Sequence, residues 1–214
     1  MIADKIHYEL LEQWIKILKK LLSTKYKKLE KYIFFSWWTS LMFKYDNFYR
    51  FSKNLDFIVN IAWKKFDKQF YQLFSELKKQ LEIFTENNEI PVYNSFWNWR
   101  EFIFQWENGI WSIKIDFMYD YPLQSEKCCE INKISDLDIF INKLQRLNKT
   151  DLQDLKFLQK VNSFDTKKII KWIRGKSQAL YWNKYYLDNK ILQNISKTKW
   201  FKFLYEIENE LKNI

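Results

Sequence analysis

Two aspartates in strand-like segments are the residues of this chain that are best suited to hold a divalent metal. Asp56 lies near the end of the segment RFSKNLDF, and Asp116 lies in the segment SIKIDF. Phosphoryl and nucleotidyl transfer need a divalent cation, because charge builds on the phosphate oxygens and must be neutralised in place. Magnesium prefers hard oxygen ligands, usually a few carboxylates together with substrate phosphates. The two aspartates are therefore candidate magnesium ligands.

A phosphate-binding turn would have to lie beside these carboxylates. Backbone N–H groups at the start of a helix bind phosphates, so a turn of small residues is expected ahead of the metal-bearing strand. The segment SWWTS, with Trp37 and Trp38 at its centre, stands in that position and reads as a turn into a helix. Lys143, on a later helical segment, is a candidate phosphate clamp.

Each of these residues also has an ordinary structural interpretation. An aspartate at the end of a strand is more often solvated or a capping residue, and a lysine on a basic surface is usually just solvated. Spacing alone therefore leaves two interpretations open: a metal site, or solvated and capping residues that bind no metal.

Glycine usage makes the turn at Trp37 and Trp38 unusual. The chain has 2 glycines and 11 tryptophans, whereas average usage would give about 15 glycines in this length. Our hypothesis is that some of these tryptophans are UGA codons from a lineage that reads UGA as glycine. The alternative is a set of true aromatic residues in a Trp-rich core. UGG codons at positions 37 and 38 would exclude the glycine hypothesis.

Composition limits the class of protein. A net charge of +10 favours a polyanionic partner, although AT-rich coding bias also inflates the lysine count. No apolar run reaches the roughly 18 residues of a membrane span, and acidic residues such as Asp4 and Glu9 argue against an N-terminal targeting signal. The adjacent pair Cys128–Cys129 has neither metal-ligand nor disulfide-framework spacing. We expect a cytoplasmic, reduced protein with no membrane partner.

Hydrophobic periodicity places the strands in the middle of the chain. It predicts an amphipathic helix over 4–22 and a long helix over 64–86, with strands at Tyr32–Phe35 and within Phe51–Asn60. Three more strands are predicted in the middle of the chain, with a hairpin turn at Glu107-Asn108-Gly109 and the end of the sheet at Tyr121-Pro122. These three are Val92–Phe96, Glu101–Trp106 and Ile110–Met118.

Beyond Ser135, a plausible helix N-cap, the sequence is helical throughout. The predicted helices are Leu137–Leu147, Asp151–Val161, Thr166–Arg174 and a C-terminal pair. Strands in the middle and helices at the ends predict an α+β fold, in which a mixed β-sheet core with flanking helices is followed by a C-terminal helical bundle. We assign 1–125 to the sheet core with its N-terminal helix and 126–214 to the helical domain.

The stretch Phe34–Phe57 resembles the signature of the nucleotidyltransferase AbiEii/AbiGii toxin family. That signature is close to GGT-x-L, a variable stretch, and then R-[FY]-S-x-D-[LI]-D-[FL]; WWTSL and RFSKNLDF stand in the two places. Later segments resemble the strand with the third carboxylate and a K-x-x-[AR]…K-D-x-x-D-L block, namely Ile113–Phe117, Lys143–Arg146 and Lys149–Leu155. The motifs follow the family's order.

The resemblance implies a nucleotidyltransferase-like sheet core that uses Mg²⁺ to move a nucleoside monophosphate from an NTP to an acceptor. In characterised relatives the acceptor can be the 3′ end of tRNA, and the enzyme is the toxin of a toxin–antitoxin pair. RNA and a cognate antitoxin are therefore the partners that the resemblance implies.

The resemblance also implies roles for single residues. Asp56 would bind the metal, and Asp116 would bind it and act as, or orient, the base for the attacking hydroxyl. Lys143 would hold the triphosphate. The remaining residues would cradle phosphate (Trp37, Trp38, Thr39), lie beside the metal strand (Ser52), anchor the loop (Arg50) and order the helices around Lys143 (Asp151, Asp154).

Two positions depart from the family pattern. Asn54 replaces the first carboxylate of the D-x-D motif; it offers a neutral oxygen to Mg²⁺, and the lost charge should weaken the site about tenfold or more. Trp37 and Trp38 replace two glycines, and their indoles would fill the phosphate space and disfavour the positive φ that glycine allows. Three interpretations follow: an active enzyme, an inactive relative that binds RNA or a partner protein through its basic surface, and a helical scaffold with coincidental motifs.

Overall fold

The computed structural model describes residues 2–45, 54–60, 68–69, 72–73, 75–77, 79–80, 92–96, 99–105, 112–181, 183–195 and 202–212. The chain divides into two compact units. The first, or sheet unit, comprises Met1–Asp120 with Ser125–Lys133; the second, or helical unit, comprises Tyr121–Gln124 with Ile134–Ile214. Of the helices described, none is long and apolar enough to span a membrane.

Seven strands among the described residues form one mixed sheet, in the spatial order β3-β4-β5-β2-β1-β7-β6. Their bounds are β1 Ile33–Ser36, β2 Asn54–Val59, β3 Val92–Phe96, β4 Trp99–Gln105, β5 Ser112–Tyr119, β6 Ser125–Cys128 and β7 Ile131–Ile134. The central strand β2 runs parallel to β5 and antiparallel to β1. The sheet continues antiparallel from β5 through β4 to β3, and on its other side β1 runs parallel to β7.

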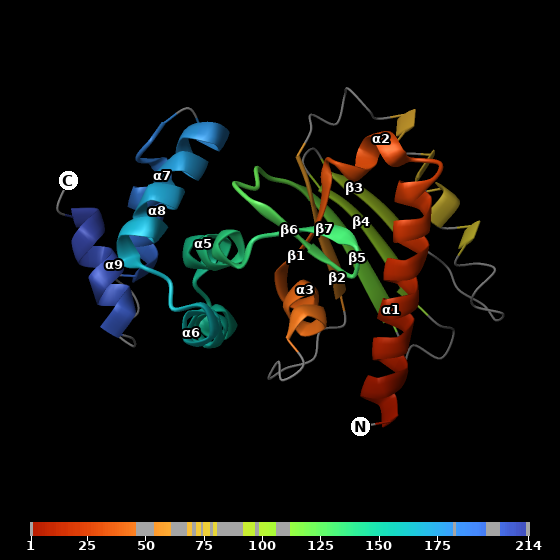
Figure 1. Cartoon of the computed structure of the whole chain (residues 1–214), viewed down its shortest axis with the longest axis horizontal. Coiled ribbons are helices and arrows are strands. Elements are labelled where there is room, and N and C mark those ends of the chain that lie inside the picture. Colours follow the sequence, from red (N-terminus) through yellow and green to blue (C-terminus); the bar gives the residue numbers. More distant parts are fainter. Residues whose placement is uncertain are drawn as a thin grey trace. The chain divides into compact units, whose positions relative to one another are not determined.

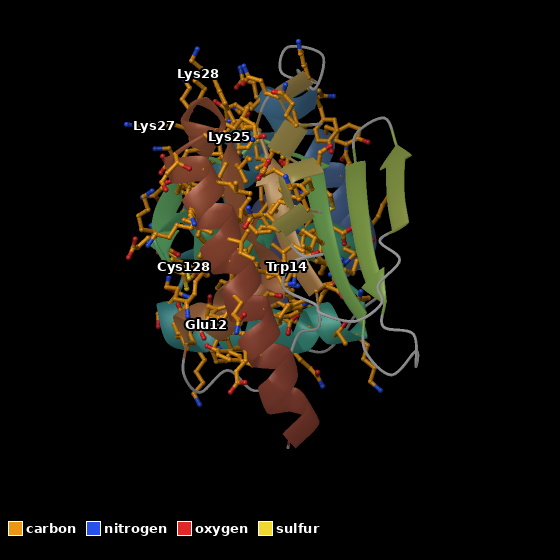
Figure 2. The ribbon with its side chains drawn as sticks, turned by 90° about the vertical axis from the view of Figure 1, so that its right-hand side faces the viewer. Glu12, Trp14, Lys25, Lys27, Lys28 and Cys128 are labelled. Atoms are coloured by element: carbon orange, nitrogen blue, oxygen red, sulfur yellow. The ribbon has the colours of Figure 1, made fainter. Side chains whose placement is uncertain are left out.

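Helix α1 (Ile2–Ser23) covers one face of this sheet (Figure 1). Its apolar residues recur at helical spacing, and Leu11, Trp14 and Leu18 belong to the same buried cluster as Leu55 and Phe57 of β2. The burial of this stripe explains why the amphipathic helix predicted over 4–22 forms. Short helix α2 (Lys27–Glu30) follows, and the lysines labelled in Figure 2 gather where α1 meets α2.

Most predicted elements of the sheet unit are observed. Strands β1 to β5 lie at the segments that the sequence predicted, and helix α3 (Trp37–Lys44) begins within the SWW segment that was predicted as a turn. The described residues between 68 and 80 are helical, as the pattern over 64–86 predicts. The predicted hairpin turn Glu107-Asn108-Gly109 lies outside the described residues.

The prediction that the sheet ends at Tyr121-Pro122 is wrong, because β6 and β7 follow it and join the sheet beside β1. Both strands are short, and neither shows a clear apolar pattern. Lys133 occupies a fully buried position in β7, where its Nζ lies 2.7 Å from Oε1 of Glu126 in β6. The sheet unit accordingly runs to Lys133, beyond the boundary placed after residue 125.

The turn between β6 and β7 consists of Cys129 and Glu130, whose φ angles are 51° and 62°. Two-residue hairpin turns with positive φ at both positions match the twist of the strands and usually carry Asn-Gly. Cys-Glu gives no such signal, which is a second reason why the sequence pattern does not reveal this hairpin.

The helical unit contains the helices predicted beyond Ser135. They are α5 Asp136–Arg146, α6 Lys149–Asn162, α7 Thr166–Tyr181, α8 Tyr186–Ile195 and α9 Lys202–Lys212. The predicted N-cap is confirmed, because the Ser135 hydroxyl accepts the backbone N–H of Asp138 at 3.1 Å. The buried Asp138 carboxylate accepts the backbone N–H groups of Leu123 and Gln124, both at 3.2 Å. These bonds fix the segment 121–124 to the start of α5.

The Lys133–Glu126 pair gives a test of the β6–β7 hairpin. Glu126→Ala removes the carboxylate that lies beside the buried Lys133 ammonium and also pairs with Lys44, so we expect the free energy of unfolding to fall by about 1–3 kcal/mol. Lys133→Met combined with Glu126→Ala removes both charges and should stay within about 1 kcal/mol of the native chain. Urea denaturation followed by tryptophan fluorescence measures both. Equal losses for the single and the double variant would contradict this account.

Candidate functional site

The two candidate metal ligands of the sheet unit are cross-strand partners. Strands β2 and β5 run parallel in a register that pairs Asp56 with Asp116 and Asn54 with Lys114. Adjacent strands lie about 4.8 Å apart, and paired residues in register point to the same face. The structure therefore places the two carboxylates next to each other at the centre of the sheet.

The alternation of the strands sends these carboxylates away from the apolar core. Leu55, Phe57 and Phe117 belong to the buried cluster packed against α1, so their neighbours Asp56 and Asp116 must face the other side of the sheet. Asp116 is 5% exposed, Asp56 is half-buried and Asn54 is exposed. The partial exposure of Asp56 and Asn54 leaves this group open on one side.

Lys114 also belongs to this group, although the sequence analysis did not single it out. Its Nζ lies 3.1 Å from Oδ2 of Asp116, two residues along the same strand. The signal that could have found it is the i, i+2 spacing of Lys114 and Asp116, which places both on one face. The ammonium supplies positive charge directly beside the more buried carboxylate.

Helix α3 begins beside the two carboxylates. Ser36, the last residue of β1, pairs in register with Asp56, and its hydroxyl donates to the Asp56 carbonyl oxygen at 3.1 Å. The Thr39 hydroxyl, in the first turn of α3, donates to the carbonyl oxygen of Asn54. These two bonds hold the N-terminus of α3, where the first backbone N–H groups and the positive end of the helix dipole lie, against β2.

Trp37 is the first residue of α3, directly after β1, and has a φ of 58°. This left-handed backbone conformation costs an L-residue about 1–2 kcal/mol and costs glycine nothing. Trp38, the next residue, is 8% exposed and has its side chain in the interior. Position 37 therefore has the backbone geometry that glycine favours.

The remaining predicted residues do not all fall in the sheet unit. Arg50 and Ser52 lie outside the described residues. Lys143, Asp151 and Asp154 belong to α5 and α6 of the helical unit, where Lys143 Nζ lies 3.1 Å from Asp151 Oδ1 and 3.2 Å from Asp154 Oδ2. The two acids therefore surround the predicted phosphate clamp.

Asp151 carries the negative charge of this helical group. Arg146 donates to it from Nη2 at 2.6 Å and from Nε at 2.8 Å. Burial alone would raise the pKa of Asp151, but the hydrogen bonds from Arg146 and the charges of Lys143 and Arg146 hold that pKa below its ordinary value. Burial raises the pKa of Asp154 to about 9.

The donor set of the sheet unit fits a hard divalent cation. Asp56 and Asp116 offer two neighbouring carboxylates, and Asn54 lies two residues before Asp56 with a neutral amide oxygen. Magnesium is commonly bound through one or two carboxylates plus substrate phosphates and water, and does not require a full protein cage. Within the described ranges, no group of three or more His, Cys, Asp or Glu side chains is arranged to hold a metal ion.

Comparisons with known proteins bear on the fold. No protein-family model matches the chain, and neither does any curated protein sequence. Among solved structures, the fold is similar to that of JHP933 from Helicobacter pylori, with a TM-score of 0.50 and 18% sequence identity. The match covers 96% of this chain and 88% of that protein. It agrees with the α+β fold, a sheet core followed by helices, and at this identity it speaks to the fold alone.

The backbone at the start of α3 predicts that substitution by glycine changes stability differently at Trp37 and at Trp38. Trp37→Gly relieves the left-handed strain and loses only a half-buried indole, so stability should change by about 1 kcal/mol or less. Trp38→Gly empties a buried position inside a helix and should cost about 3–5 kcal/mol. Chemical denaturation of the two variants measures the difference. A Trp37→Gly loss as large as that of Trp38→Gly would refute the left-handed geometry.

The lowered pKa of Asp151 predicts how the helical unit responds to acid. A carboxylate with a lowered pKa stabilises the fold fully above the ordinary aspartate pKa of about 3.9, and less as pH falls through its folded pKa. Asp151→Asn should therefore cost about 2 kcal/mol at pH 7, and the difference from the native chain should shrink towards pH 2. Thermal melts followed by circular dichroism at both pH values test this. Exposed Glu206→Gln is the control, and a pH-independent Asp151→Asn difference would contradict the prediction.

Proposed function

We propose that the chain is a cytoplasmic Mg²⁺-dependent nucleotidyltransferase that transfers a nucleoside monophosphate from an NTP to an acceptor, as the toxin of a toxin–antitoxin pair. The observation that carries the proposal is the in-register pairing of Asp56 with Asp116 beside the start of α3. The resemblance of RFSKNLDF and its neighbouring motifs to the AbiEii/AbiGii signature supports the same activity. The 3′ end of tRNA is the acceptor to test first.

Each candidate site residue of the sheet unit has a role in this proposal. Asp56 and Asp116 would hold Mg²⁺, with Asn54 as a neutral ligand, and the ion would supply positive charge to the phosphate oxygens. The acceptor hydroxyl would attack the α-phosphate of the NTP and displace pyrophosphate. Asp116 would act as, or orient, the base that takes the hydroxyl proton, and Lys114 would orient the Asp116 carboxylate through the 3.1 Å ion pair. The backbone N–H groups at the start of α3 would bind the phosphates of the NTP.

A second candidate function has specific observations in its favour. Asn54 stands where the family has a carboxylate, and Trp37 and Trp38 stand where it has glycines. Asn54 weakens the attraction for a cation, and Trp37 and Trp38 do not give the turn the open backbone that two glycines would give it. These features suit an inactive relative that keeps the fold and binds RNA or a partner protein through its basic surface.

The decisive experiment incubates the full chain with radiolabelled NTPs, total tRNA and Mg²⁺. We expect label to enter RNA, and Asp116→Ala to lower the rate at least about a hundredfold, because a positioned base contributes roughly 10²–10⁴. Glu12→Ala is the matched control, since Glu12 lies on α1, which packs on the opposite face of the sheet. An unchanged rate in Asp116→Ala would refute the role of that carboxylate.

The same assay separates the active enzyme from the inactive relative through Asn54→Asp. The added charge should lower the Mg²⁺ concentration for half-maximal transfer about tenfold. Absence of transfer from the native chain, from Asn54→Asp and from Trp37→Gly combined with Trp38→Gly would favour the inactive relative. Circular dichroism of each variant shows whether its fold is intact.

A further inference from the structure

Helix α7 presents a line of positive charge along one face. Lys167, Lys171 and Arg174 recur at intervals of four and three residues, which is the spacing that keeps side chains on one side of a helix. Gln178 continues the line by one more turn. The two lysines and Gln178 are exposed, and Arg174 is half-buried.

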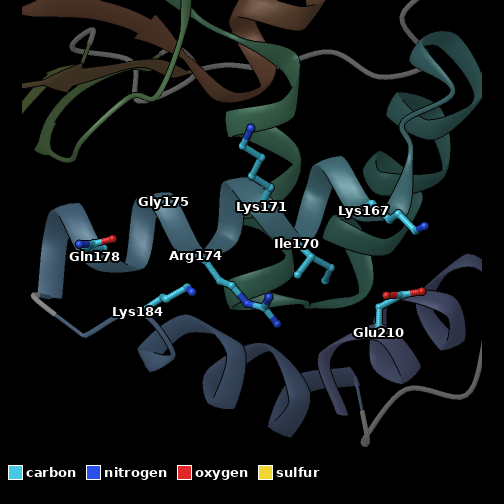
Figure 3. A pocket seen from close by; sticks show the side chains of 8 residues that line it. All are labelled: Lys167, Ile170, Lys171, Arg174, Gly175, Gln178, Lys184 and Glu210. Atoms are coloured by element: carbon cyan, nitrogen blue, oxygen red, sulfur yellow. The ribbon is translucent and has the colours of Figure 1, made fainter. Parts of the chain in front are cut away.

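These side chains line a cavity of about 480 Å³ within the helical unit (Figure 3). Lys184, from the turn between α7 and α8, and Glu210, from α9, complete the charged residues of its lining. Four of the lining residues carry positive charge and one carries negative charge. We call this the basic cavity; its charge suits an anionic ligand.

Arg174 is held in place at this cavity. Its Nε donates to Oδ2 of Asp188 in α8 at 3.2 Å, and its guanidinium carbon lies 5.7 Å from the centre of the Tyr185 ring. Its Nη2 is buried and has no hydrogen-bond partner in the part of the chain that the structure describes. The guanidinium is thus fixed at the cavity, where it adds positive charge beside Lys167 and Lys171.

Exposed tyrosines cluster beside the basic cavity, at the turn between α7 and α8. Tyr185 is 42% exposed, and Lys184 Nζ lies 5.5 Å from the centre of its ring. Tyr181 and Tyr186 are 39% and 44% exposed and stack on each other with ring centres 4.0 Å apart. Unpaired bases stack on exposed aromatic rings, and cations next to those rings attract the phosphates.

We propose that the basic cavity and the tyrosines of the α7–α8 turn bind a single-stranded polynucleotide. Phosphates lie against Lys167, Lys171 and Arg174, and bases stack on Tyr185 and on the outer face of the Tyr181–Tyr186 pair. A duplex keeps its bases stacked inside and makes no use of the tyrosines, so the surface favours unpaired strands. RNA and DNA share this chemistry. The inference deepens the RNA binding of the second candidate function by naming the surface that would carry it, and it does not depend on nucleotidyl transfer.

The test is fluorescence anisotropy of the full chain with labelled oligouridylate and oligothymidylate of 12 nucleotides and with a duplex of the same length. We expect both single strands to bind more tightly than the duplex. Lys167→Ala with Lys171→Ala should weaken binding about tenfold and reduce the slope of log K against log salt by about 1.4, as the loss of two phosphate contacts requires. Tyr185→Ala should weaken single-strand binding about fivefold or more and leave duplex binding unchanged.

The matched control is Lys156→Ala with Lys160→Ala, which removes two exposed lysines at the same i, i+4 spacing from α6. We expect this pair to leave affinity and salt slope nearly unchanged. Four outcomes would overturn the proposal: no binding of either single strand at 50 mM salt, equal losses in the two lysine pairs, duplex binding as tight as single-strand binding, or no effect of Tyr185→Ala. A preference for RNA or for DNA identifies the source of the strand, and either one supports the site.

Discussion

A ladder of three stacked phenylalanines sets the geometry of the sheet unit. Phe35, Phe57 and Phe117 are register partners on β1, β2 and β5, with ring centres 5.3 Å and 5.1 Å apart along the ladder. All three are buried against α1. A slip of one residue in any of these strands would turn its phenylalanine away from the core. The burial of the ladder therefore makes such slips costly.

The same ladder fixes the candidate site, because Asp56 and Asp116 each adjoin one of its phenylalanines in sequence. Side chains alternate along a strand, so seating Phe57 and Phe117 in the core places both carboxylates side by side on the opposite face. Ser36, next to Phe35, brings the start of α3 to the same place. The arrangement of the polar group is thus a consequence of apolar packing.

Local patterns in the sequence were sufficient for part of this structure. Alternation revealed β2 and β5, helical spacing revealed α1, and Ser135 marked the start of α5, since each of these signals lies within one segment. The pairing of Asp56 with Asp116 depends on contacts between strands about 60 residues apart and could not be derived from either segment. Strand β7 was missed because a buried lysine, paired with a glutamate from β6, stands in the middle of it.

In the helical unit, buried charged side chains are the feature that local sequence patterns predict least well. Lys143 and Lys176 are almost fully buried and would read as surface residues on any hydropathy scale. Lys143 lies between Asp151 and Asp154, and Lys176 donates to Asn142 Oδ1 at 2.6 Å. A buried ion pair contributes little net stability but is costly to break, and a buried ammonium also needs its hydrogen-bond acceptor, so both lysines constrain how the helices pack.

The path of the chain has a consequence for synthesis on the ribosome. Residues 121–124 belong to the helical unit, whereas 125–133 return to the sheet unit before the remaining helices follow. A nascent chain that has emerged as far as residue 120 would therefore expose the edge of β1 that β7 later covers. Unpaired strand edges recruit other chains, so the short interval before residue 133 emerges is when the growing polypeptide would most need a chaperone.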